Sequence, residues 1–163
     1  MHDVRKIEAG DKPGFYRELI AQAEGLFHGE RDAIANAANM SALIYDAVAD
    51  LNWAGFYFLK SADELVLGPF QGKVACVRIP VGKGVCGSAV AEKCSQLVPD
   101  VHAFPGHIAC DAASRSELVV PLMRDGIIFG VLDLDSPLPG RFTEEDQAGF
   151  EALAALYVTA SDL

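Results

Sequence analysis

Long apolar runs and clustered basic residues are both missing from this sequence of 163 residues. No apolar stretch reaches the roughly 18 residues that a membrane-spanning helix needs, and residues 1–6 are not followed by the apolar core of a signal peptide. The 13 basic and 23 acidic residues give a net charge of −10, so the attraction that drives binding to nucleic acids or anionic membranes is missing. We therefore expect a cytosolic protein that binds neutral or cationic partners and neither nucleic acid nor membrane.

Closely spaced cysteine pairs are also missing, although the chain has four cysteines: Cys76, Cys86, Cys94 and Cys110. A structural zinc site normally needs a pair separated by two to four residues, so we predict no metal site. Permanent disulfides are a poor explanation in a compartment that keeps thiols reduced. Redox chemistry fits better, provided that folding brings Cys110 near Cys76 or Cys86. The alternative is that each cysteine is a small buried apolar residue.

The composition predicts one domain over residues 1–163, because apolar residues make up 51% of the chain and charged residues 22%. Helical spacing of apolar residues predicts helices over 14–28 and 31–51, and a third helix after Thr143. Alternation predicts strands over 53–59, 64–70, 73–80, 96–98, 117–123 and 127–135, with a short helix within 81–94. Residues 99–116 have no period and read as a functional loop. The predicted fold is α+β, with an antiparallel sheet of about six strands and helices packed on one side.

The environments of three cysteines follow from these elements. Cys76 falls in the predicted strand 73–80, and Cys110 falls in the long loop. Cys86 lies at a glycine-rich helix start, where the helix dipole favours a thiolate.

Residues 117–135 predict a hairpin whose register depends on the length of its loop. A three-residue loop, Arg124-Asp125-Gly126, pairs Met123 with Ile127 and therefore Glu117 with Asp133. A two-residue loop pairs Arg124 with Ile127 instead. The longer loop is favoured because it makes one continuous apolar face from Leu118, Val120, Leu122, Ile128, Leu132 and Leu134, and places Val119, Phe129 and Val131 on the other.

Three acids gather at the far end of this hairpin. Asp133 and Asp135 share one strand face, and the favoured register brings Glu117 opposite Asp133. Two such charges about 4 Å apart repel by roughly 4 kcal/mol at an intermediate dielectric, enough to bind an ammonium group or to keep one acid protonated. A protonated acid at neutral pH is a general acid. The alternative is that Asp133 and Asp135 merely end a strand.

Trp53 is the only tryptophan and lies early in the first predicted strand. Such a residue is more often part of a core than of a binding site. An aromatic wall would nevertheless suit an apolar methyl or thioether group.

Several long motifs occur in a characteristic order. They are Gly-Pro-Phe-Gln-Gly-Lys-Val-Ala-Cys at 68–76, Gly-Lys-Gly-Val-Cys-Gly at 82–87, Pro-Asp-Val-His at 99–102, Phe-Pro-Gly-His-Ile-Ala-Cys-Asp at 104–111 and Ser-Glu-Leu-Val-Val-Pro at 116–121. Together they closely resemble the free methionine-(R)-sulfoxide reductases, which are single-domain enzymes with the GAF fold. The resemblance covers residues 52–136 in detail and agrees with the order of the flanking helices.

The resemblance implies a role for three of the cysteines. Cys110 would attack the sulfoxide sulfur, Cys76 would resolve the resulting sulfenic acid as a disulfide, and Cys86 would be an auxiliary thiol. No cofactor would be bound, since thioredoxin, supplied by NADPH, would restore both thiols. Cys94 lies outside the family's pattern and is assigned no role.

The resemblance also implies how the substrate is held. Asp135 would donate a proton to the sulfoxide oxygen, while Glu117 and Asp133 would bind the substrate ammonium. Trp53 would face the S-methyl group, and the main-chain amides near Ile108, Ala109 and Cys110 would receive the carboxylate.

Two other functions stay open. One is a non-catalytic sensor of the same fold that binds a small amino compound or switches with the redox state of its thiols. The other is a structural zinc domain. A homodimer is expected only from the habits of the fold.

Overall fold

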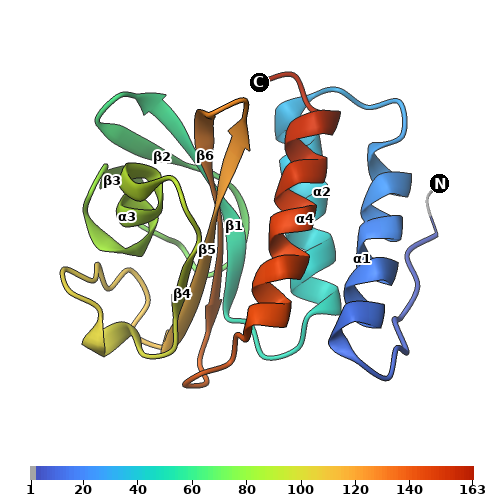
Figure 1. The fold of residues 1–163 in the computed structure, drawn as a ribbon, viewed down its shortest axis with the longest axis horizontal. Helices are drawn as coiled ribbons and strands as arrows, with labels where there is room; N and C mark the ends of the chain where they lie inside the picture. The colour runs from blue at the N-terminus through green and yellow to red at the C-terminus, as the bar shows by residue number, and fades with distance from the viewer. Residues whose placement is uncertain (1–2) are drawn as a thin grey trace.

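Six strands of the computed structural model, which describes residues 3–163, form one antiparallel sheet with the order β3-β2-β1-β6-β5-β4. Helices α2 and α4 cover one face of the sheet, α1 packs on the outer side of these two helices, and the short helix α3 lies on the other face (Figure 1). The elements are α1 (Lys12–Phe27), α2 (Ala33–Ala47), β1 (Trp53–Ser61), β2 (Glu64–Gly72), β3 (Arg78–Pro80), α3 (Gly84–Glu92), β4 (Gln96–Val98), β5 (Ser116–Arg124), β6 (Ile127–Ser136) and α4 (Glu144–Ala160). The predicted fold class is confirmed, and α3 is the short helix expected within 81–94. It lies on the opposite face of the sheet, whereas the prediction put the helices on one side.

Acidic side chains start the two N-terminal helices. The Asp11 carboxylate accepts a hydrogen bond from the Gly14 amide at 2.8 Å, and Asp32 accepts one from Ala35 at 2.8 Å. At α4 the Thr143 amide donates to Asp146 at 2.8 Å, which confirms the helix start predicted there. None of the helices among the described residues has the length and apolar character that crossing a membrane requires.

The sheet separates two apolar cores. On the helix side, Phe56, Leu118 and Leu132 pack with side chains of α1, α2 and α4 such as Phe150. On the α3 side, the alternate residues of the same strands pack with α3. Both faces of the central strands are therefore buried, and the α3 side is the one that carries the polar cavity described below.

The turn between β5 and β6 differs from the prediction. Arg124 pairs with Ile127 across a two-residue loop, in which Asp125 (φ 53°) and Gly126 (φ 76°) both take the left-handed conformation of a tight hairpin. A bulge follows, and from Leu122–Gly130 onward the two strands stay in a single register.

This bulge has two consequences for side chains. Ile128 packs on the α3 side and Phe129 on the helix side, the reverse of the prediction. Glu117 pairs with Asp135, and Val119 pairs with Asp133, so the predicted pairing of Glu117 with Asp133 is wrong. The other residues keep their predicted faces. The two-residue loop and the bulge together shift the register by two positions, and side chains alternate between the faces of a strand with a period of two.

The third predicted strand is shorter than expected. Only Arg78–Pro80 forms β3, while residues 73–77 form a loop, so Cys76 does not lie in a strand. In this loop Cys76 is bonded to Cys110, and its carbonyl oxygen accepts a hydrogen bond from the Tyr57 hydroxyl at 2.8 Å, so the segment is held by contacts outside the strand ladder.

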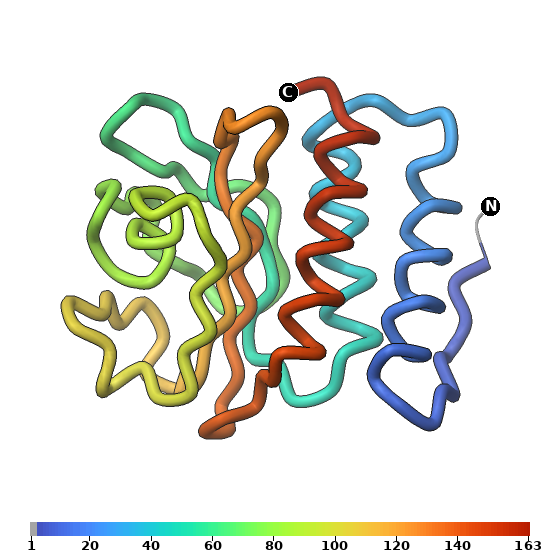
Figure 2. The backbone as a smooth tube through the Cα atoms, viewed as in Figure 1, coloured from blue at the N-terminus to red at the C-terminus, as the bar shows by residue number. Residues whose placement is uncertain are grey.

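The long loop after β4 lies beside α3 in the backbone trace (Figure 2). It contains one short 3-10 turn, Val101–Ala103, and is otherwise irregular, as predicted. At Gly84, the first residue of α3, an added Cβ would lie 3.1 Å from the Ile108 side chain, so the loop packs closely on the start of this helix.

Candidate active site

A cavity of about 50 Å³ lies between the α3-side face of the sheet, the start of α3 and the two loops that carry Cys76 and Cys110. Most of the site residues expected from the sequence line it: Trp53, Cys86, Ile108, Cys110, Glu117, Asp133 and Asp135. Ala109 does not line it and is exposed. Folding thus collects side chains from β1, α3, β5, β6 and the long loop in one place.

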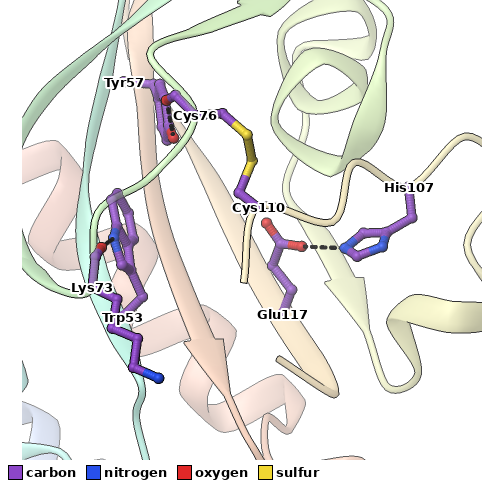
Figure 3. Close-up of a disulfide and its surroundings, with 7 residues drawn as sticks. All are labelled: Trp53, Tyr57, Lys73, Cys76, His107, Cys110 and Glu117. Atoms are coloured by element: carbon purple, nitrogen blue, oxygen red, sulfur yellow. Dashed lines mark hydrogen bonds and ion pairs between the residues drawn. A yellow bond between two sulfur atoms is a disulfide. The ribbon is translucent and has the colours of Figure 1, made fainter. Parts of the chain in front are cut away.

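Cys76 and Cys110 form a disulfide with a Cα–Cα distance of 5.6 Å (Figure 3). This is the pair that the family resemblance implied. Since Cys110 lines the cavity and Cys76 lies in the loop at its edge, the bond joins the two loops beside the site. A disulfide with one sulfur facing a polar cavity fits a redox pair better than a buried apolar role for the two cysteines.

Cys86 is a buried free thiol in the first turn of α3. Burial raises the pKa of this thiol well above its usual value, and the nearby carboxyl groups of Asp133 and Glu117 raise it further. The helix start therefore does not make Cys86 a thiolate, contrary to the prediction, because desolvation and neighbouring acids outweigh the helix dipole.

The three acids lie together in the cavity although their register differs from the prediction. Burial raises the pKa of Glu117 well above its usual value, and Asp133 and Asp135 raise it further. Burial, then the charges of Asp133 and Asp111, likewise raise the pKa of Asp135 well above its usual value. Glu117 and Asp135 therefore keep their protons to higher pH than a solvent-exposed carboxyl group does, which suits each of them to donate a proton.

Asp133 is the acid that ionises first. Burial raises its pKa to about 6, while the side chains of Glu117 and Cys86, which are close enough to donate hydrogen bonds to the carboxylate, limit this rise. Its Oδ1 atom is buried, and no group among residues 3–163 is in hydrogen-bond geometry with it. A buried anionic oxygen without a donor is a site for a cation with N–H groups.

His107 approaches the acids from the long loop. Its Nε2 atom lies 4.0 Å from Glu117 Oε2 (Figure 3). Burial and the nearby His102 lower the pKa of His107. The shifts of both pKa values favour the uncharged forms of His107 and Glu117, which weakens this contact as an ion pair.

Aromatic rings form one wall of the cavity. Trp53 is only 3% exposed and stacks on Tyr57 and Phe70, with ring centroids 5.8 and 5.2 Å away. Its indole nitrogen donates to the Lys73 carbonyl oxygen at 3.2 Å (Figure 3). Trp53 is thus both a core residue and a wall of the site, so the two interpretations of its role do not exclude each other.

Tyr57 and Ser114 are among the lining residues that were not singled out from the sequence. Tyr57 shares a strand face with Trp53, so the alternation along β1 could have indicated it. Ser114 lies in the irregular loop, where no periodic signal exists, and its hydroxyl accepts a hydrogen bond from the Asn52 side chain at 3.0 Å.

The main-chain amides expected to bind a carboxylate differ from one another. The Cys110 amide donates to the Ile108 carbonyl oxygen at 3.1 Å and is therefore already engaged. The Ile108 and Ala109 amides have no acceptor among residues 3–163. Only these two are free to bind an anion.

One group of side chains has the spacing of metal ligands. Ligand atoms of Cys86, Glu117 and Asp133 all lie within 4.8 Å of one another. Asp133 is also the residue whose buried oxygen can bind a cation, so a metal ion and an ammonium group would compete for the same position.

Cys94 lies apart from this site. It is exposed beyond the end of α3, and its thiol lies 3.7 Å from Glu92 Oε2. Cys94 has no disulfide partner, and neither has Cys86.

Known proteins share both the sequence and the fold of this chain. Residues 35–161 match the GAF domain family. The free methionine-R-sulfoxide reductase of Escherichia coli is 57% identical over 145 residues, which are 89% of this chain and 87% of that protein. The protein of the same description from Saccharomyces cerevisiae is 45% identical, covering 90% of this chain and 85% of its own length.

A solved structure shows the same fold. The free methionine-R-sulfoxide reductase of Neisseria meningitidis, in complex with its substrate, has 45% sequence identity and a TM-score of 0.93, and the match covers 98% of this chain and 95% of that one. The chain therefore belongs to the free methionine-R-sulfoxide reductases, a family of oxidoreductases built on the GAF domain.

Proposed function

We propose that this protein reduces free methionine-(R)-sulfoxide to methionine, with Cys110 as the nucleophile and Cys76 as the resolving cysteine. The observation that supports this most directly is the position of their disulfide. It lies beside a cavity that also holds two acids whose pKa is raised by burial and a buried carboxylate oxygen with no hydrogen-bond donor among residues 3–163.

The chemical steps follow from these groups. The Cys110 thiolate attacks the sulfoxide sulfur while Asp135 gives a proton to the sulfoxide oxygen, methionine leaves, and Cys110 becomes a sulfenic acid. Cys76 then attacks that sulfur, water leaves, and the Cys76–Cys110 disulfide forms. In this scheme Cys86 is not an electron carrier, because its thiol is buried and its pKa is raised.

The substrate's two charged ends explain the choice of a free amino acid. Its ammonium group binds Asp133 and Glu117, and its carboxylate binds the free amides of Ile108 and Ala109. Its methyl group packs on Trp53. A methionine sulfoxide within a peptide carries neither charge, so the groups that bind them would stay unpaired and that substrate is rejected.

Turnover requires that the disulfide be reduced again. We propose thioredoxin, supplied by NADPH, as the reductant, and no bound cofactor. A reducing compartment such as the cytosol would supply thioredoxin and NADPH. Oxidative stress would supply the substrate, since oxidants convert methionine to its sulfoxide.

The test is a thioredoxin-coupled assay that follows NADPH oxidation with separate R and S epimers of free methionine sulfoxide. We expect turnover with the R epimer only and none after Cys110→Ser. After Cys76→Ser we expect one equivalent of methionine per chain and no recycling. Cys94→Ser, which removes an exposed thiol outside the site, is the matched control and should leave the rate unchanged. Equal rates with both epimers would contradict the assigned pocket, and no turnover with either would favour a sensor.

A further inference from the structure

Two valines beside the disulfide are unusually exposed for apolar residues. Val74 is 88% exposed, more than any other large apolar side chain among residues 3–163, and Val77 is 58% exposed. They flank Cys76 in the loop 73–77, which leaves the sheet at the end of β2. We call these two side chains the valine surface.

The disulfide cannot be reopened by the chain itself. An attack by Cys86 or Cys94 would only move the disulfide to another pair of cysteines, and Cys86 is buried as well. Net reduction needs two electrons from a thiol donor outside the chain. That donor must reach one of the two bonded sulfur atoms from solvent.

The charges next to the two sulfur atoms differ. The segment 73–78 carries two cations and no acid, in a chain whose net charge is −10. Arg78 is paired with Glu64 at 2.6 Å, so Lys73, which has no ion-pair partner among residues 3–163, supplies the free positive charge next to Cys76. Cys110 is followed by Asp111, whose pKa is lowered chiefly by a hydrogen bond from the Ala113 amide, so it stays ionised. An incoming thiolate is therefore repelled near Cys110 and attracted near Cys76.

We propose that the valine surface is the docking site of a protein dithiol, and that this partner attacks Cys76 rather than Cys110. The partner's thiolate forms a bond to Cys76 Sγ, the Cys76–Cys110 bond breaks, and Cys110 leaves as a thiolate. The partner's second thiol then attacks the partner's first sulfur, which is the one bonded to Cys76 in the mixed disulfide. Cys76 leaves as a thiolate and takes up a proton, so the partner is oxidised and this chain has gained two electrons.

This inference rests on the proposed function for its biological purpose, but its test does not need methionine sulfoxide. The oxidised chain is mixed with reduced thioredoxin, and loss of the Cys76–Cys110 disulfide is followed directly by thiol labelling. The double variant Val74→Ser/Val77→Ser is compared with Ile127→Ser/Leu138→Ser, since Ile127 and Leu138 are 61% and 45% exposed and lie in other loops and strands.

We expect thioredoxin to reduce the Val74→Ser/Val77→Ser chain about tenfold more slowly than the parent, because apolar contacts with the partner are lost. The control variant should be reduced at the parent's rate. Dithiothreitol, which is too small to need a docking surface, should reduce all three chains equally. Equal slowing with both reductants, or no slowing with thioredoxin, would overturn the proposal.

The site of attack is tested separately with a thioredoxin whose second cysteine is replaced by serine, which traps the mixed disulfide. Peptide mass spectrometry should find thioredoxin on Cys76, and a bond to Cys110 would contradict the assignment. If the oxidised chain is reduced as expected but the parent does not turn over methionine sulfoxide, the proposed function fails and the docking site stands.

Discussion

The three acids of the cavity have different roles because Glu117, Asp133 and Asp135 lie in different environments. Asp133 ionises first, with a pKa of about 6, and offers a buried oxygen that has no hydrogen-bond donor among residues 3–163. Glu117 and Asp135 keep their protons to higher pH, since burial and the neighbouring charge of Asp133 oppose their ionisation. One patch thus supplies both an anion and acids that hold their protons more tightly and can donate them.

Substitution of Glu117 and Asp135 should separate their roles. We expect Asp135→Asn to lower kcat by about 100-fold with little change in KM, because it removes the proton donor and little of the binding. We expect Glu117→Gln to raise KM by about tenfold, since a bound ammonium group lowers the pKa of Glu117 and lets it ionise, which an amide cannot do. Steady-state kinetics on the free R epimer measure both effects, and the opposite pattern would exchange the two roles.

Asp133 should also make folding stability depend on pH. Its pKa rises from 3.8 to about 6 on folding, so the folded state holds this proton more tightly. The resulting stability is present below pH 3.8 and is lost as the pH rises through about 6, at a cost of about 3 kcal/mol above that pH. Asp133→Asn removes this cost.

We therefore expect the Asp133→Asn variant to have nearly the parent's Tm at pH 4 and a Tm several degrees higher at pH 8. Thermal unfolding followed by circular dichroism across this range measures the difference. Asp63→Asn, at an exposed position in the β1–β2 turn, is the control and should not change with pH in this way. A constant difference at all pH values would contradict the assignment of Asp133.

At the scale of elements, the β5–β6 hairpin shows how a local turn and a distant pairing share control of the register. Asp125 and Gly126 make the tight two-residue turn, and the bulge next to it restores the face of every later residue. The apolar pattern correctly predicted which face each acid occupies but not which acid stands opposite Glu117. A shift of two residues leaves a period of two unchanged, so the pattern is the same in both registers.

The contact between α1 and α4 depends on a glycine. A Cβ atom at Gly149 would overlap the ring of Tyr16, whose hydroxyl donates to Asp146 at 2.7 Å. We expect Gly149→Ala to cost about 1–3 kcal/mol in the free energy of unfolding, because the buried ring cannot move away. Gly25→Ala in α1 has nothing within 4 Å of the added Cβ and should instead stabilise by about 0.5–1 kcal/mol. Urea unfolding of both variants provides the comparison, and a stable Gly149→Ala protein would show that the two helices can separate at little cost.

At the scale of the whole molecule, the sheet separates stability from chemistry. The three long helices lie on one side of the sheet, with α2 and α4 against it and α1 outside them, and the cavity, α3 and both cysteine loops occupy the other side. We propose that the whole chain works as one domain, since every strand joins the same sheet. The homodimer and the cytosolic location stay predictions.

The disulfide ties two loops 34 residues apart in the chain, so its redox state should change global stability. By the chain-entropy relation, closing a loop of this length stabilises by up to about 4 kcal/mol. We expect the oxidised parent to melt several degrees above the reduced parent. Cys94→Ser should keep this difference and Cys76→Ser should abolish it, as measured by calorimetry with and without reductant. A reduced chain as stable as the oxidised one would mean that strain or residual structure cancels the constraint.

The order of the elements, the residues of the acid patch and the apolar faces of the strands, apart from Ile128 and Phe129 at the bulge, follow from the sequence alone, because periodicity acts over neighbouring residues. The three-dimensional fold decided the rest. It drew Cys76 out of the sheet and bonded it to Cys110, paired Glu117 with Asp135, and buried Cys86 where its thiol keeps its proton. These features depend on contacts between segments far apart in the chain and on burial, and neither leaves a period in a linear sequence.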